Sequence, residues 1–513
     1  MKNRAKIFWI TALFAGSILT LGSCSDYLDK MPENQLPVDD TDYTITSNAY
    51  KQVVGIYGLA GQRFTAWGTL GFIAVRGDDT EKGGALNDQA EFRDLHNFNY
   101  TSVPTFWVNN ETWKGLYRIV MSSNLAIEAL DKYSVYASAA DKAKIEIYKG
   151  EVRFLRAYSY FILARTYGGV PVFTDNKSPE ATVKRTHQEV IRFIISECEQ
   201  ISEILPALRP VNAEHKGAAT KYSALALQAK AASDILDYDV MLRATNSIIE
   251  SGEFGLFPDY YNLFKKSCEL SQENLFELQY TFQGSETGDS FVSDNYWAFQ
   301  GPGVGANFKS VKKFGTNNEQ NMEGGWGFLP VNKKLSDFMS SRNESVRYQT
   351  LVLPTSGMFD QNNNSCFITL SNDTLYPGGE GSPTQYNGKA YLPSQELVRS
   401  LYGGDKNIIM IRYADILLLN AEARISTGGN GDQQINMVRE RAGMPAITGA
   451  TIDDLIDERY VEFGCEYGER YYDLVRTGKA ETVLANQGNG YTADKRFYPI
   501  PQEQVDLNPS LGE

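Results

Sequence analysis

The sequence predicts a mainly α-helical fold in which tetratricopeptide-like helical hairpins form a scaffold and long irregular segments form a loop-rich region. The first observation is a series of alanine-rich stretches in which apolar residues recur three or four positions apart, the spacing of one helix face. Large and small residues alternate there, as in close helix pairs, although the period is too irregular for an ideal repeat array. The second observation is that residues 61–100 and 283–400 lack this period and are rich in glycine and aromatic residues.

Size and charge limit the possible classes. The chain has 513 residues, which favours a large domain built on repeats or two closely packed lobes. Its formal net charge is −14 and becomes more negative without the basic N-terminus. No basic tract offsets this charge, so the composition argues against a nucleic-acid partner.

Residues 1–23 have the pattern of a lipoprotein signal peptide. After a basic start, the apolar stretch Ile7–Leu21 is too short to span a membrane comfortably. Small residues then precede Cys24 in the form of a lipobox, so we expect Cys24 to carry the lipid anchor; the alternative is an ordinary secretory signal cleaved elsewhere. Residues 24–40 would then be a lipidated tether and residues 41–513 the body.

The periodicity places the helices in order along the chain. The expected helices are Tyr43–Leu59, Trp113–Leu130, Ile145–Tyr167, Gln188–Leu205, Thr220–Leu236, Tyr238–Glu250, Ile411–Ser426 and Gln433–Arg441. Ile145–Tyr167 has a clear stop signal in the two glycines that follow it. These helices assign the repeat scaffold to residues 105–270 and 410–480, and leave residues 61–100 and 283–400 as the loop-rich region.

The four cysteines after Cys24 are Cys198, Cys268, Cys366 and Cys465. None of their spacings is C-x-x-C, so a zinc or redox motif is not indicated. Cys198 and Cys465 lie in helical patterns and are expected to be buried thiols. A disulfide remains open, because an exported protein meets an oxidising environment.

The stretch from Thr451 to Lys479 is predicted to be one helix with Thr451 as its N-cap. A row of carboxylates follows one of its faces, with arginines beside it: Asp454, Glu458, Glu462 and Glu466, with Arg459, Arg470 and Arg476. Such a row suggests catalysis or metal binding, but Arg–carboxylate pairs that lock helices together explain it better. On this interpretation Arg459 reaches Glu462 and Arg470 reaches Asp473 across one turn.

The same stretch resembles the C-terminal signature of the SusD/RagB family of outer-membrane nutrient-binding lipoproteins. The matching residues are Glu458, Arg459, Glu462, Phe463, Glu466, Gly468, Arg470, Asp473, Leu474, Arg476 and Gly478. Tyr467 is an addition that is expected to shift the end of the helix. Residues 151–171, with Arg153 and Arg156, residues 412–423 and residues 499–511 are similar to further signatures of the family.

The resemblance implies a lipid-anchored protein of the outer membrane, exposed at the cell surface, that captures an oligosaccharide or a peptide. It implies a TonB-dependent, SusC-like transporter as the partner, which the protein would cap as a lid. Arg153 and Arg156 would serve with the C-terminal signature as structural residues. No catalytic residue, metal or cofactor is expected.

The candidate ligand-binding residues lie in the two irregular segments: Trp67, Asp78 and Asp79 in the first, and Tyr296, Trp297 and Trp326 in the second. Aromatic rings stack on the C–H faces of sugars, and carboxylates accept hydrogen bonds from hydroxyls. Rigid aromatic platforms also bind peptides. For Trp326 the alternative is a loop plug packed onto the helices, and Asp78 with Asp79 is a weak metal pair because no third ligand is identifiable.

Two other classes of function stay open. A glycoside hydrolase needs only two carboxylates, and it predicts a cleft near Trp326 with two facing carboxyl groups, at least one of raised pKa. The three histidines, His96, His187 and His215, are scattered and form no recognisable nucleophile or zinc arrangement. A helical-repeat interaction scaffold with no ligand of its own is the second alternative.

Overall fold

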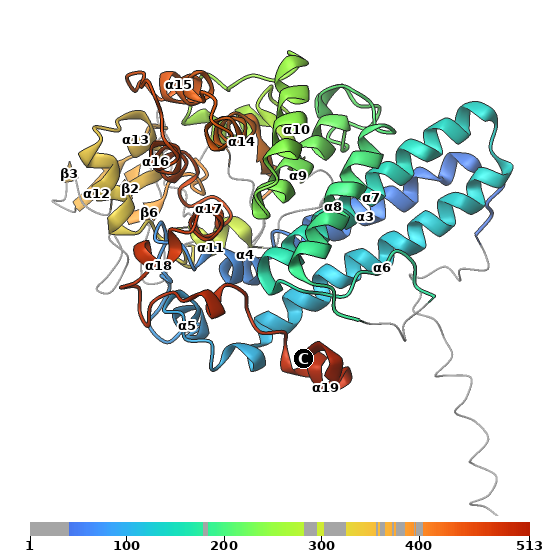
Figure 1. Ribbon diagram of the computed structural model, residues 1–513, viewed down its shortest axis with the longest axis horizontal. Helices are drawn as coiled ribbons and strands as arrows, with labels where there is room; N and C mark the ends of the chain where they lie inside the picture. Colours follow the sequence, from blue (N-terminus) through green and yellow to red (C-terminus); the bar gives the residue numbers. More distant parts are fainter. Residues whose placement is uncertain are drawn as a thin grey trace, which may run out of the picture.

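The computed structural model describes residues 41–177, 183–281, 295–301, 325–354, 358–359, 365–371, 374–375, 385–393, 396 and 404–512. Successive helices pack against one another and form a curved scaffold, with the long α6–α7 hairpin at one end and small sheets at the other (Figure 1). The predicted mainly α fold with a hairpin scaffold is confirmed. The signal peptide, Cys24 and the tether lie outside the described residues.

The scaffold helices are α3 (Tyr50–Arg63), α6 (Trp107–Tyr136), α7 (Ala139–Tyr167), α8 (His187–Ser202), α9 (Lys221–Asp234), α10 (Tyr238–Glu250), α14 (Tyr413–Ser426), α15 (Asp432–Arg441), α16 (Ile452–Phe463) and α17 (Glu469–Arg476). The shorter helices are α4 (Trp67–Ala74), α5 (Glu91–His96), α11 (Tyr296–Gln300), α12 (Lys333–Ser341), α13 (Val346–Leu351), α18 (Ala480–Val483) and α19 (Gln502–Leu507). Short 3₁₀ helices include Val103–Thr105, just before α6.

A two-stranded antiparallel sheet joins the two ends of the large insertion between α10 and α14. Strand β1 (Asn274–Leu278) pairs with β7 (Ile408–Arg412). Chain segments far apart in sequence therefore meet where the insertion leaves and rejoins the scaffold. The insertion carries the other strands: β2 (Val352–Pro354) with β6 (Gln385–Asn387), and β3 (Met358–Phe359), β4 (Ser365–Ile368) and β5 (Thr374–Leu375).

Three sequence predictions need correction. Residues 61–100 are not wholly irregular, because they contain α4 and α5; α4 is buried on all sides and so shows no amphipathic period. The predicted helix from Ile411 begins only at Tyr413, since β7 occupies the residues before it. The predicted helix from Thr451 is two helices.

The break between α16 and α17 follows from backbone conformation. Cys465, Tyr467 and Gly468 have φ of 62°, 45° and 75°. A Cβ at Gly468 would lie 3.0 Å from the Cα of Ala74, so the chain can pass α4 this closely only with glycine there. The N-terminal end is as predicted: Thr451 forms a capping box with Asp454.

Three members of the carboxylate row, Glu458, Glu462 and Glu466, form an ion-pair lattice, as the scaffold interpretation predicted, whereas Asp454 is exposed and caps α16. Glu462 is fully buried and meets Arg347, Arg412 and Arg441. Glu458 likewise meets Arg342, Arg347 and Arg439, and Glu466 meets Lys389 and Arg412. The arginines that meet these carboxylates therefore join α16 to the elements packed around it.

Individual pairings differ from those expected along the helix. Arg459 donates to Asp415 and Asp473 rather than to Glu462, and Arg470 donates to Asp78 rather than to Asp473. Arg476 pairs with both Asp473 and Glu422. On the other side of the scaffold, Arg153 and Arg156 share Glu197 of α8. Arg459 and Arg470 thus reach carboxylates of other elements instead of those one turn along their own helix.

The cysteines in the described part form no disulfide. Cys198, Cys268 and Cys465 are buried free thiols, which confirms the prediction for Cys198 and Cys465. The side chain of Cys366 lies outside the described part. In the residues described, no helix is both long and apolar enough to cross a bilayer.

Candidate ligand-binding site

Three buried phenylalanines form the floor of the candidate site. Phe299 of α11 stacks on Phe328 with ring centroids 4.6 Å apart, and Phe92 of α5 meets both rings edge-on at 6.1 and 6.0 Å. All three are 1% exposed or less. A Cβ at Gly71 would lie 2.8 Å from the Phe299 and Phe92 rings, so α4 needs glycine there to approach this floor.

Three tryptophans lie above the floor. The Trp67 ring is 5.5 Å from Trp107 and 5.4 Å from Trp326, at interplanar angles of 62° and 84°. Trp67 also packs on Phe299 at 5.5 Å. Trp107 is 48% exposed, and Trp67 and Trp326 are half-buried. We call Trp67, Trp107 and Trp326 the tryptophan platform; its rings are fixed by one another and are in part open to solvent.

Backbone hydrogen bonds bring the two irregular segments together at this point. Trp326 N–H donates to Ala298 O at 2.6 Å, and Gly327 N–H donates to Gly301 O at 2.8 Å. Gly84 N–H of the first segment donates to Gly327 O at 2.8 Å, and Gly83 forms a β-bridge with Phe328. The position of Trp326 beside Trp67 is therefore set by the main chain.

Tyr296 and Trp297 do not join the tryptophan platform. In the short helix α11, Phe299 faces the floor, whereas the Trp297 ring packs against Gly404 with the Lys406 ammonium 4.7 Å from its centroid. Its indole N–H is buried without an acceptor among the described residues. Tyr296 packs edge-on against Trp297 at 4.7 Å. Trp297 instead packs α11 against the segment of Gly404 and Lys406, and Tyr296 packs on Trp297.

The assignment of Asp78 and Asp79 to ligand binding does not fit the structure. Asp78 is 4% exposed, and its carboxylate accepts from Arg470 at 2.8 Å. Asp79 is fully buried and accepts from the Cys465 backbone N–H at 2.8 Å. Burial raises the pKa of Asp79 to about 6. These carboxylates join the first irregular segment to α17 and to the α16–α17 connection.

Trp107 was missed because its position gave no periodic signal. It is the first residue of α6, directly after a 3₁₀ turn, and so it precedes the apolar pattern that marks the helix. A tryptophan just before the apolar pattern of a long helix, next to an irregular segment, is the sequence signal that could have identified it.

The described residues give no support to a metal centre or to Asp79 as a catalytic acid. No group of three His, Cys, Asp or Glu there is arranged to hold a metal ion. Asp79 has the raised pKa that a glycosidase acid needs, but its full burial keeps it from facing a cleft. The site can present stacked rings and backbone groups, which suits recognition.

The described part of the chain is thus a helical-hairpin scaffold on which α4, α6 and the large insertion form a partly exposed aromatic platform. Two family models match this chain: "SusD family" over residues 284–513, and "Starch-binding associating with outer membrane" over residues 26–232. Together they match most of its length. The chain belongs to the SusD/RagB family.

Individual relatives are similar to this chain over nearly its whole length. A SusD-like protein of Formosa agariphila is 26% identical, with 98% of both chains covered. The solved structure of surface glycan-binding protein A from Bacteroides thetaiotaomicron has a TM-score of 0.75 at 24% identity, covering 92% of this chain and 98% of that one. The same protein in complex with laminarihexaose gives a TM-score of 0.73 at 24% identity, covering 91% and 98%. These structures share the fold of the present chain.

Proposed function

We propose that this protein captures an oligosaccharide on the tryptophan platform and delivers it to a TonB-dependent, SusC-like transporter, for which it acts as a lid. The observation that carries the proposal is the platform itself. Rings fixed edge to face, with Trp107 48% exposed, expose flat apolar surfaces on which the C–H faces of sugar rings stack.

The comparisons support a carbohydrate over a peptide. One family model is described as starch-binding, and a structural neighbour is described in complex with laminarihexaose, a glucose oligomer. The phenylalanine floor keeps the tryptophans in place before the ligand arrives, which lowers the entropy lost on binding. The alternative of a glycoside hydrolase is less well supported, because Asp78 and Asp79, the two carboxylates that the sequence assigned to this region, are 4% exposed or less.

Delivery requires attachment and release. Lipidation at Cys24 holds the body at the outer membrane, on the cell surface, and the helical side docks the transporter while the platform stays free. Affinity for the oligosaccharide is modest, because transfer into the transporter needs a fast dissociation rate.

Trp107→Ala in the soluble body, residues 25–513, is expected to weaken glycan binding by about tenfold or more while leaving the fold intact. Loss of one stacking partner in a small site costs about 1.4 kcal/mol or more, and truncation of a half-exposed side chain disturbs stability little. Calorimetric titration with starch and laminarin oligosaccharides, and with peptides, measures the effect. Trp67→Ala and Trp326→Ala should weaken binding as well.

Tyr136→Ala is the matched control, because Tyr136 is 60% exposed at the other end of the same helix. It should bind as the wild type does. Equal affinity of the wild type and all three tryptophan variants would remove the platform from the site. Peptide binding without glycan binding would change the ligand class, and sugar release in a parallel hydrolysis assay would favour the glycosidase.

A further inference from the structure

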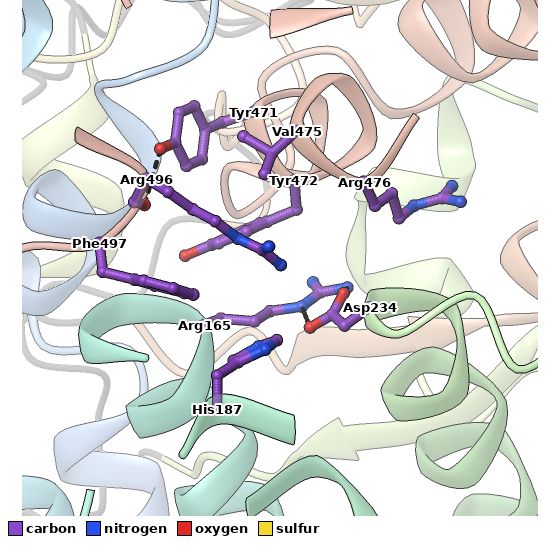
Figure 2. Close-up of a pocket in the computed structure, with 9 residues that line it drawn as sticks. All are labelled: Arg165, His187, Asp234, Tyr471, Tyr472, Val475, Arg476, Arg496 and Phe497. Carbon is purple, nitrogen blue, oxygen red and sulfur yellow. Dashed lines mark hydrogen bonds and ion pairs between the residues drawn. The ribbon is translucent and has the colours of Figure 1, made fainter. Parts of the chain in front are cut away.

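A pocket outside the tryptophan platform lies where the C-terminal segment crosses the scaffold. It is lined by side chains of α7, α8, α9, α17 and that segment: Arg165, His187, Asp234, Tyr471, Tyr472, Val475, Arg476, Arg496 and Phe497 (Figure 2). It has about 260 Å³ of empty space, part of which is open to solvent. Its enclosed part has room for one particle of the size of a water molecule.

Two of the three arginines that line the pocket are neutralised by carboxylates. Arg165 donates to Asp234 through Nε at 2.8 Å and Nη2 at 2.9 Å, and it also pairs with Glu469. Arg476 pairs with Asp473 and Glu422. Asp234 is the one carboxylate in the lining, and both of its oxygens are engaged by Arg165.

Arg496 has no such partner. Its guanidinium makes no hydrogen bond or ion pair with the residues that the structure describes, and it lies over the Phe497 ring at 4.9 Å. The backbone carbonyl of Arg496 is fixed by bonds from Arg76 at 3.1 Å and Tyr471 at 2.8 Å. The side chain points into the pocket towards Arg165 and His187 (Figure 2). The pocket therefore contains one unmatched positive charge.

His187 is the second group without a polar partner there. Its imidazole packs against Phe497 at 5.0 Å and makes no hydrogen bond within the described part of the chain. Burial lowers the pKa of His187 to about 4; the Asp234 carboxylate opposes this effect, and the Arg496 and Arg165 guanidinium groups add to it. A neutral imidazole beside an unpaired guanidinium supplies one N–H donor without adding a second charge.

We propose that this pocket binds a single small inorganic anion of the size of chloride, held by the guanidinium of Arg496 and the imidazole N–H of His187. The anion bridges the C-terminal segment, which carries Arg496, to α8, which begins at His187. The small enclosed space, which continues into the part of the pocket that is open to solvent, favours a single-atom anion over a larger one, and the one unmatched guanidinium favours a single negative charge. This site is independent of the proposed glycan capture.

Histidine-selective NMR of the whole body tests the proposal, because the chain has only three histidines. Sodium gluconate is replaced stepwise by sodium chloride at constant ionic strength. The His187 signal is expected to shift saturably, while His96 and His215 act as internal references. Arg496→Gln should weaken the chloride response by about tenfold or more, because a charge-assisted hydrogen bond is lost. Arg118→Gln, at an exposed position of α6, should respond as the wild type does.

An unresponsive His187 in the wild type, or an equal response in Arg496→Gln, overturns the proposal in favour of a bound water. Should Arg496→Gln fail to fold, wild-type crystals soaked in sodium bromide give an independent answer. Anomalous density for bromide between Arg496 and His187 is then the expected result, and its absence there contradicts the site.

Discussion

Glu462→Gln is expected to lower the free energy of unfolding by about 3–5 kcal/mol, the cost of removing one partner from a buried charge cluster. Glu462 is fully buried and is the shared acceptor of Arg347, Arg412 and Arg441. The amide keeps the shape of the side chain but leaves the positive charges of three guanidinium groups without their common counter-charge. Denaturant unfolding at neutral pH measures the loss.

The same residue sets an acid limit to stability. The three arginines lower the pKa of Glu462, against the opposing effect of burial, from 4.5 to about 2. The stabilisation is therefore present above pH 4.5 and is lost as the pH falls through about 2. The wild type should lose its advantage over Glu462→Gln across this interval.

Glu111→Gln provides the control for Glu462→Gln. Glu111 forms an ion pair with Lys114 at 2.8 Å, with both side chains about half exposed, so its loss should cost less than about 1 kcal/mol. If Glu462→Gln had the same free energy of unfolding as Glu111→Gln, the buried ion pairs of Glu462 would not stabilise the packing of α16 against its neighbours.

The helices of the scaffold could be predicted from the sequence because apolar periodicity is a local property of the chain. Tyr238–Glu250 was predicted with its observed bounds, and the Thr451 cap and the ion-pair role of Glu458 and Glu462 were also correct. The partners of the arginines were not predictable, because a pair such as Arg470 with Asp78 joins residues 392 positions apart. Periodicity along one helix carries no information about such contacts.

The candidate site was predicted in part for the same reason. The aromatic residues of the two irregular segments pointed to Trp67 and Trp326, whose rings do meet. Composition could not show that Asp78 is buried against Arg470, or that α11 turns Trp297 away from Trp326. Whether a loop residue is exposed or buried depends on which segments pack over it. Long-range backbone hydrogen bonds, such as the one from Gly84 to Gly327, determine that packing.

The opposite pH dependence is expected from Glu151, a buried carboxyl group without a cation. It is 3% exposed, and within the described residues its polar contacts are the hydroxyls of Tyr57 at 3.0 Å and Tyr50 at 3.4 Å. Burial raises its pKa to about 8, against the smaller opposing effect of the two tyrosine hydrogen bonds; Glu214 adds to the rise. At neutral pH the folded protein therefore holds a proton here that the unfolded chain releases.

Because the folded pKa is raised above 4.5, the stability linked to this proton is complete below pH 4.5 and is lost as the pH rises through about 8. Between these values the free energy of unfolding should fall by up to about 1.4 kcal/mol per pH unit. Glu151→Gln does not titrate and can still accept from Tyr57. It should match the wild type near pH 4.5 and exceed it by a few kcal/mol, as an order of magnitude, above about pH 8.

Unfolding free energies of the wild type and Glu151→Gln, measured across pH 4.5 to about 8, check this expectation. Glu111→Gln serves again as the exposed reference, and its curve should run parallel to that of the wild type. Parallel curves for Glu151→Gln as well would mean that the Glu151 carboxyl ionises in the folded state much as it does in the unfolded chain. A growing advantage for the amide with rising pH would establish that the α3–α7 contact, where Tyr57 meets Glu151, is held together by a protonated acid.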